Sequence, residues 1–167
     1  MKGGNKLTKE ALGSLILSSE RQLYATAKSI LANDQDCADA IQESIVKAFS
    51  KIDTLRKEQY AKTWLIRILI NECYNIVRRN NSNDHLDECY AENMIKHKEN
   101  RDYSELYKAV NELKEELRIP VILYYMEEFS VREIAQILDV SEGAVQKRLA
   151  RAREKLKKII RLEEIFA

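Results

Sequence analysis

The sequence predicts an all-α protein, because it lacks the residues that tight turns between strands require. Of the 167 residues, 4 are Gly and 1 is Pro, where average usage gives about 20 of the two together. No Gly occurs between Ser14 and Glu142. Hairpins and barrels need turn residues with positive φ, so an all-β fold is nearly excluded. Gly-rich phosphate loops and dinucleotide-binding loops are excluded outright.

Helical periodicity predicts the elements of the first half. An amphipathic pattern over 7–31 fits two short helices or one bent helix. Residues 33–36 form a break with an acidic N-cap, and a helix over 37–52 follows. After a polar stretch at 53–59, a long helix covers 60–79. The helix over 37–52 is expected to bury one stripe, formed by Ala38, Ile41, Ile45, Ala48, Phe49 and Ile52.

A flexible linker over 81–103 is expected to separate a first helical domain, 7–80, from a second, 104–163. The segment opens with Asn and Ser residues that favour turns. Between 80 and 105, seven acidic side chains face three basic ones, which gives a net charge of −4. Low apolar content and like charge are typical of chain that cannot bury enough surface to fold.

The second half begins with a predicted helix near Ser104. Another follows over about 116–128, in which Pro120 is tolerable only in the first turn or at a kink. Next comes the strongest functional signal, a helix-turn-helix. Ser130 and Glu133 form a capping box for a short helix that ends at 138, and Ser141 caps a long helix that reaches about 160. In such motifs the second helix enters the DNA major groove.

Charge supports the DNA-binding interpretation of that second helix. From Ser141 to Arg161 there are eight basic and two acidic residues, a net charge of +6. The formal charge of +1 for the whole chain argues against a nucleic-acid partner when taken alone, but it conceals two opposed blocks. A solvated helix pair in a bundle is the plainer alternative, and for an isolated amphipathic pair it would be preferred. Both caps, the short turn and the basic helix together favour DNA.

Two further faces admit a functional and a plain interpretation. In the predicted helix over 60–79 one row carries Trp64, Arg67, Asn71, Asn75 (or Tyr74) and Arg78. Such groups can stack on bases, pair with phosphates and read base edges. A buried Trp with solvated polar neighbours explains the row equally well. The polar face of the helix over 37–52, with Asp39, Gln42, Glu43 and Lys47, is more often simply solvated than a partner surface.

Three motifs in order resemble the bacterial sigma-70 family. Ala38 to Glu43 is similar to the Asp-x-x-Gln signature that opens region 2.2, and Trp64 to Asn71 to the Trp-Leu-x-Arg-Ile-x-x-Asn signature of regions 2.3 and 2.4. Glu133 to Arg153 resembles region 4. With regions 2 and 4 joined directly, the layout resembles an extracytoplasmic-function (ECF, group IV) sigma factor. The run from Arg118 to Pro120 and the Tyr-rich stretch after it resemble the sigma-V/sigma-W side of the family.

The resemblance implies a promoter-specificity subunit with no catalytic residues, cofactor, metal or small-molecule substrate. Its implied partners are core RNA polymerase, promoter DNA and a cognate anti-sigma factor, often membrane-bound, in a stress response. The residues implied to bind core polymerase are Asp39, Gln42 and Glu43. Those implied to face the −10 element, whose flipped-base pocket is shaped by the loop over 54–59, are Arg56, Lys57, Tyr60, Trp64, Arg67, Asn71, Asn75 and Arg78. Those implied to lie at the −35 element are Ser141, Glu142, Gln146, Lys147, Arg148, Arg151 and Arg153.

The sequence departs from the family pattern in region 4. Gln146 and Lys147 stand where Lys-Ser or Arg-Ser is commoner, and Ala144 stands where Thr is usual. Both differences bear on which −35 sequence is read, so base-level specificity does not carry over. Gly143, the only Gly after Gly13, is expected to let the helix N-terminus approach the DNA backbone or the preceding helix.

Two other classes of protein are weighed against this interpretation. A helix-turn-helix repressor or activator predicts a two-fold dimer on a palindrome, but it has no need of the Asp-x-x-Gln and Trp-Leu-x-Arg-Ile motifs. A metal or thiol enzyme would use His85, Cys89 and His97, whose spacing matches no closed zinc pattern. Cys37 and Cys73 are expected to be small core residues. Three scattered Cys, with no signal peptide and no membrane-spanning run, predict a cytoplasmic protein.

Overall fold

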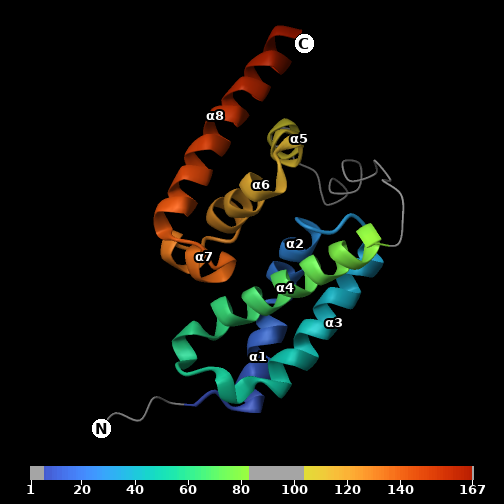
Figure 1. Ribbon diagram of the computed structural model, residues 1–167, viewed down its shortest axis with the longest axis vertical. Coiled ribbons are helices and arrows are strands. Elements are labelled where there is room, and N and C mark those ends of the chain that lie inside the picture. Colours follow the sequence, from blue (N-terminus) through green and yellow to red (C-terminus); the bar gives the residue numbers. More distant parts are fainter. Residues whose placement is uncertain (1–5, 83–103, 167) are drawn as a thin grey trace. The chain divides into compact units, whose positions relative to one another are not determined.

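The computed structural model describes residues 6–82 and 104–166, and every regular element in these ranges is helical (Figure 1). This confirms the all-α prediction. The chain divides into two compact units, Met1–Leu86 and Asp87–Ala167. Nearly all of the predicted linker, residues 83–103, lies outside the described residues.

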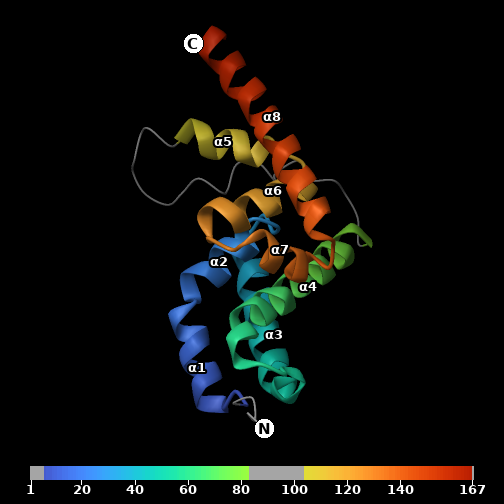
Figure 2. The same cartoon turned by 90° about the vertical axis from the view of Figure 1, so that its left-hand side faces the viewer.

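The described part of the first unit contains four α-helices and two short 3-10 helices, and it confirms the expectation of two short helices at its start. The helix α1 ends at Ser18, and the N–H of Ser19 bonds the carbonyls of Leu15 and Ile16. The most extensive packing joins α3 to α4, as the ribbons in Figures 1 and 2 also show. In order, the elements are α1 (Lys9–Ser18), α2 (Glu20–Lys28), α3 (Asp34–Ser50), η1 (Ile52–Thr54), η2 (Glu58–Tyr60) and α4 (Ala61–Ser82).

The start of α3 differs from the predicted acidic cap. Asn33 is the N-cap, and its Oδ1 accepts a hydrogen bond from the N–H of Asp36 at 2.8 Å. Asp34 and Asp36 lie inside the first turn instead. Their carboxylates are favourable there because the helix dipole places partial positive charge at this end.

The stripe predicted for α3 is partly wrong. Its fully buried residues are small ones at spacings of three and four, namely Cys37, Ala40, Ser44 and Ala48. Ala38 is exposed, and Ile41, Ile45 and Phe49 are only half-buried. Small side chains let a neighbouring helix approach closely, so periodicity counted on large apolar residues finds the wrong face. The large buried side chains come mainly from α4: Leu65, Ile66, Leu69 and Ile70.

In the second unit, the single helix expected over 116–128 is wrong. The helix α6 ends just after Pro120, and a π-helical segment, η3, continues in its place. Proline has no N–H to donate and its ring crowds the carbonyl four residues earlier, which favours a change of helix type. The N–H of Glu127 bonds the carbonyl of Ile122 at 3.0 Å, five residues back. The elements are α5 (Ser104–Glu112), α6 (Glu115–Val121), η3 (Ile122–Met126), α7 (Val131–Leu138) and α8 (Glu142–Phe166).

The helix-turn-helix prediction is confirmed down to its caps. The N–H of Glu133 donates to Ser130 Oγ at 3.2 Å, and the N–H of Ser130 donates to Glu133 Oε2 at 2.8 Å. Asp139 ends α7 in the left-handed conformation. Ser141 Oγ then accepts from the N–H of Ala144 at 3.1 Å at the start of α8. The packed residues of the two helices are Ile134, Ala135, Ile137, Val145, Leu149 and Ala152, all buried.

The expectation that Gly143 permits close packing on the preceding helix is wrong. A Cβ at this position would meet only Ser141 Oγ, at 3.9 Å, and nothing from α7 lies within 4 Å. An approach to DNA at this point stays a prediction.

Candidate partner and nucleic-acid interfaces

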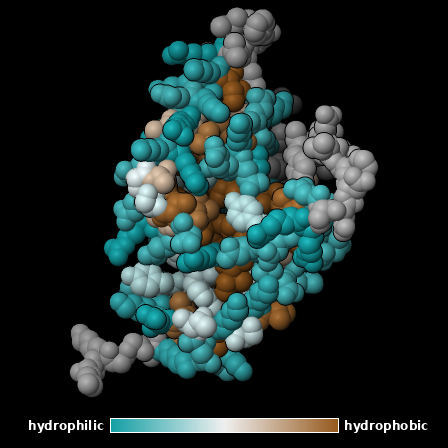
Figure 3. All heavy atoms as spheres, viewed as in Figure 1, coloured by the Kyte–Doolittle hydropathy of each residue, from teal (hydrophilic) through white to brown (hydrophobic). Residues whose placement is uncertain are grey.

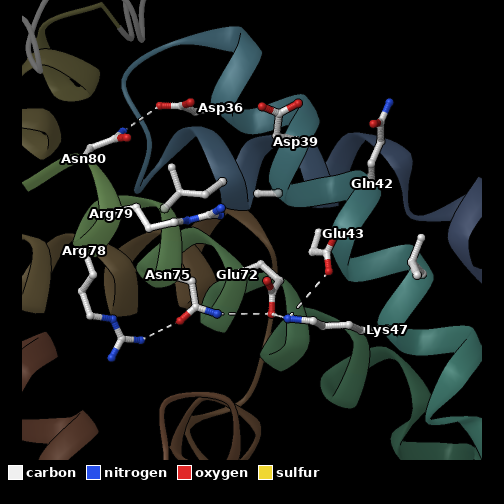
Figure 4. Close-up of a pocket in the computed structure, with 13 residues that line it drawn as sticks. Asp36, Asp39, Gln42, Glu43, Lys47, Glu72, Asn75, Arg78, Arg79 and Asn80 are labelled. Carbon is white, nitrogen blue, oxygen red and sulfur yellow. Dashed lines mark hydrogen bonds and ion pairs between the residues drawn. The ribbon is translucent and has the colours of Figure 1, made fainter. Parts of the chain in front are cut away.

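A polar groove of about 1150 Å³ lies along α3 and α4 (Figure 4). It contains the three residues predicted to dock on polymerase, and two of those predicted to face DNA, Asn75 and Arg78. From α3 its charged and amide side chains are Asp36, Asp39, Gln42, Glu43 and Lys47. From α4 they are Glu72, Asn75, Arg78, Arg79 and Asn80.

A chain of hydrogen bonds connects the two walls of this groove (Figure 4). Lys47 Nζ donates to Glu72 Oε1 at 2.6 Å, and it lies 3.9 Å from Glu43 Oε1. Asn75 Nδ2 lies 3.5 Å from the same Glu72 oxygen. Arg78 Nη2 donates to Asn75 Oδ1 at 2.9 Å. Hydrogen bonds therefore link side chains from both walls of the groove, and Asp39 and Gln42 are exposed on its α3 side.

The N-terminal end of α3 is held by a second polar cluster. Tyr24 Oη and Lys28 Nζ both donate to Asp34 Oδ1 at 2.7 Å. The bond to Asp34 raises the pKa of Tyr24 to about 12, and burial raises the pKa of the adjacent Cys37 thiol to about 11. Asn80 Nδ2 donates to Asp36 Oδ2 at 3.1 Å, which ties the end of α4 to the same turn. The helix that carries the predicted docking residues is thus fixed at its start.

The predicted −10 row divides in the structure. Arg67 and Asn71 are exposed and Trp64 is half-buried on the first half of α4. Tyr60, half-buried, ends η2 just before that helix. Asn75 and Arg78 lie further along and belong to the groove. Of the remaining residues predicted for this element, Arg56 and Lys57 are exposed in the segment between η1 and η2.

The predicted −35 residues lie on the first half of α8 and at its cap. Arg148 is half-buried, and Arg153 Nη1 donates to Tyr125 Oη at 3.1 Å. In Figure 3 hydrophilic spheres cover most of the visible face of this helix. The exposed members of the set are Ser141, Glu142, Gln146, Lys147, Arg151 and Arg153.

Sequence reasoning missed Glu72 and Tyr125, the partners of predicted DNA residues. Glu72 is the only acidic residue of α4, which is the signal that could have found it. Tyr125 had no such signal, because its position depends on the π-helical segment after Pro120.

Metal and thiol chemistry finds no support in the part of the chain that the structure describes. No group of His, Cys, Asp and Glu residues there is arranged to hold a metal ion. His85, Cys89 and His97 lie outside the described residues. Cys37 and Cys73 are both buried, which confirms them as core residues. No described helix has the length and apolar character needed to cross a bilayer.

Comparison with family models defines the class of protein. A model described as sigma-70 region 2 matches residues 15–83, and one described as sigma-70, region 4 matches 103–156. The chain belongs to the sigma-70 family and, by its relatives, to the ECF sigma factors. It is a non-enzymatic subunit that binds core RNA polymerase and recognises promoter DNA to initiate transcription.

Individual relatives cover most of the chain. It is 31% identical to RNA polymerase sigma factor SigV of Bacillus subtilis over 87% of this chain and 88% of that protein. It is 35% identical to the ECF RNA polymerase sigma-E factor of Salmonella typhimurium over 71% of each. Its structure is similar to the sigma factor RpoE, solved in complex with the anti-sigma factor NepR from Bartonella quintana. That similarity has a TM-score of 0.74 and 25% identity, and it covers 89% of this chain and 96% of that one.

Proposed function

We propose that three surfaces of the protein have separate roles in the initiation of transcription. The exposed α3 wall of the groove docks on core RNA polymerase through Asp39, Gln42 and Glu43. The loop before α4 and that helix as far as Arg78, with Asn75 included, bind the −10 element, and the first half of α8 binds the −35 element. The observation that carries the proposal is that the three sets lie on different elements and that most of their side chains are exposed.

At the −10 element the protein has to stabilise unpaired DNA. Exposing a base costs a few kcal/mol, and stacking on an aromatic side chain contributes about 1–3 kcal/mol per base. Trp64 and Tyr60 are half-buried, so each keeps part of its ring available for stacking. Arg56, Lys57 and Arg67 supply positive charge for the strand beside them. This arrangement supports promoter melting as well as binding.

At the −35 element, some side chains contact base edges and read the sequence, and others contact phosphates and fix the position of the protein on the DNA. Gln146 and Lys147 are exposed and project from the first turns of α8, where a recognition helix meets base edges. Arg148, Arg151 and Arg153 are assigned mainly to phosphates, which fix register without reading sequence. The Ser141 hydroxyl already accepts the capping bond from Ala144, so it contributes through the helix N-terminus.

We also propose a cognate anti-sigma factor as a third partner. The similar structures of RpoE and of CnrH, the latter at 21% identity and a TM-score of 0.68, were solved with NepR and with the cytosolic domain of CnrY. A partner of this kind would cover the polymerase and DNA surfaces, with 7–80 and 104–163 as domains and 81–103 as the linker between them. It would hold a cytoplasmic sigma factor, near the membrane where the partner is membrane-bound, until a stress signal arrives.

Combined replacement of Asp39 and Gln42 by Ala tests the docking surface. Loss of two polar contacts that the complex with polymerase would bury lowers the affinity for core polymerase by at least about tenfold, measured by fluorescence anisotropy of the labelled full-length protein. A matched pair of exposed residues on α1, Glu10→Ala with Ser14→Ala, leaves affinity unchanged. An affinity of the Asp39 and Gln42 variant within twofold of the original would contradict the assignment.

A further inference from the structure

Glu72 is a buried acid for which the three surfaces give no reason. Only 5% of the residue is exposed, although most of the other buried residues of its helix are apolar. A buried carboxylate is costly unless it is paired and hydrogen-bonded. Lys47, from the other wall of the groove, supplies the charge at 2.6 Å. An apolar residue would be enough for packing, so the carboxylate indicates a role in the chain of hydrogen bonds that joins Lys47, Asn75 and Arg78.

The chemistry of the chain fixes which way the Asn75 amide points. A carboxylate can only accept hydrogen bonds, and a guanidinium can only donate them. The amide nitrogen of Asn75 therefore faces Glu72, at 3.5 Å, and its oxygen faces Arg78, at 2.9 Å. If the Glu72 acceptor is lost, only the bond from Arg78 favours this orientation, so the amide oxygen that accepts from Arg78 is held less firmly.

We propose that Glu72 is a positioning residue for the −10 element, which orients Asn75 and, through it, the Arg78 guanidinium. Lys47 anchors the carboxylate to α3. The proposal rests on the proposed contact of Asn75 and Arg78 with −10 DNA, but it assigns to Glu72 no contact with DNA of its own. The burial of Glu72 agrees with the absence of a direct DNA contact, because only 7% of its side chain is exposed.

The test uses Glu72→Gln, which keeps the shape and replaces a group that can only accept by one that also donates. Holoenzyme is assembled from core polymerase and full-length protein, and opening is followed with a fluorescent base analogue in the −10 element. The probe is a duplex selected by the unaltered holoenzyme from a random-sequence pool. We expect Glu72→Gln to reduce opening about tenfold, the size of one charged hydrogen bond, with core affinity within twofold.

A double-mutant cycle separates positioning from a structural effect. In the Asn75→Ala background, Glu72→Gln is expected to cause no further loss, because the residue through which it acts is absent. Multiplying losses, or unchanged opening with Glu72→Gln alone, would overturn the proposal. Asn75→Ala and Arg78→Ala alone test the DNA contact itself. If neither variant affects opening while Glu72→Gln does, the proposed DNA contact of Asn75 and Arg78 fails, and the positioning role fails with it. This result differs from multiplying losses, which overturn the positioning role alone.

Two further variants separate orientation from stability. Leu12→Ala empties a fully buried site in α1, away from the groove, and destabilises the same unit. While folded, it is expected to open the promoter as the original does. Glu72→Asp keeps the charge but draws the carboxylate back from Asn75. It is expected to reproduce the loss seen with Glu72→Gln, and it replaces that variant should the amide prevent folding. Normal opening with folded Glu72→Asp would also overturn the proposal.

Discussion

The region 2 unit and the region 4 unit use charged side chains in different ways. In the region 2 unit, two lysines are bonded across helices: Lys28 to Asp34, and Lys47 to Glu72. In the region 4 unit, basic side chains such as Lys147 and Arg151 stand exposed on α8. A protein partner and an opened strand need donors at fixed positions, whereas duplex phosphates attract any accessible cation. The difference therefore matches the kind of partner that each unit meets.

The largest expected effect comes from emptying the core of one unit. Ile134 is fully buried in α7, and Ile134→Ala costs about 2–5 kcal/mol. Trp64 is the only tryptophan and lies in the region 2 unit, so its fluorescence reports on that unit alone. In a thermal unfolding experiment, we expect circular dichroism to show that part of the helix of the variant is lost at a lower temperature than in the original. The transition reported by Trp64 fluorescence is expected to be unchanged. A parallel shift of both signals would mean that the units do not unfold independently.

Salt dependence is expected to distinguish the exposed cations. Arg151→Gln removes one phosphate contact, lowers affinity for −35 duplex DNA by about tenfold, and reduces the slope of log affinity against log salt by about 0.9. Titrations of holoenzyme at several salt concentrations measure both quantities. Lys158→Gln, an exposed change further along α8 and outside the proposed contacts, serves as the matched control. An unchanged slope for Arg151→Gln would remove that residue from the backbone contacts.

A smaller effect is expected inside the region 2 unit. Thr26 is fully buried, and among the described residues its hydroxyl has no hydrogen-bond partner. Thr26→Val keeps the shape and removes the unsatisfied group, which stabilises the unit by about 1 kcal/mol. Urea unfolding followed by Trp64 fluorescence measures the gain. A lower unfolding midpoint would show that the hydroxyl is bonded in solution.

The smallest predicted effect is a loss of stability at high pH confined to the same unit. The Cys37 thiol has a pKa of 9.0 when unfolded and about 11 when folded, because it is buried. Between these values the unfolded chain releases a proton that the folded chain keeps, so stability falls as pH rises, by on the order of 1 kcal/mol. Stability of the unaltered protein and of Cys37→Ala, compared from pH 8 to 10, tests this. Equal slopes for the two would contradict it.

Local signals in the sequence were enough for much of the fold. The capping box at Ser130 and the cap at Ser141 depend on residues within three positions of each other, and both were predicted correctly. The buried face of α3 was not, because it is made of small residues such as Ala40 and Ser44 that carry no hydropathy signal. Sequence reasoning placed Asn75 and Arg78 in one row with Trp64, but it could not show that α3 lies beside them and that both line a groove.

One consequence of the turns around α7 concerns why glycine is so scarce. Among the described residues two have positive φ, Glu128 at 58° and Asp139 at 56°, and they flank this helix. The left-handed conformation costs such residues about 1 kcal/mol. Glycine would relieve that cost, but it gives the unfolded chain more freedom, which costs about 0.5–1 kcal/mol. The two terms nearly cancel, so selection for stability alone has little reason to place glycine at either joint.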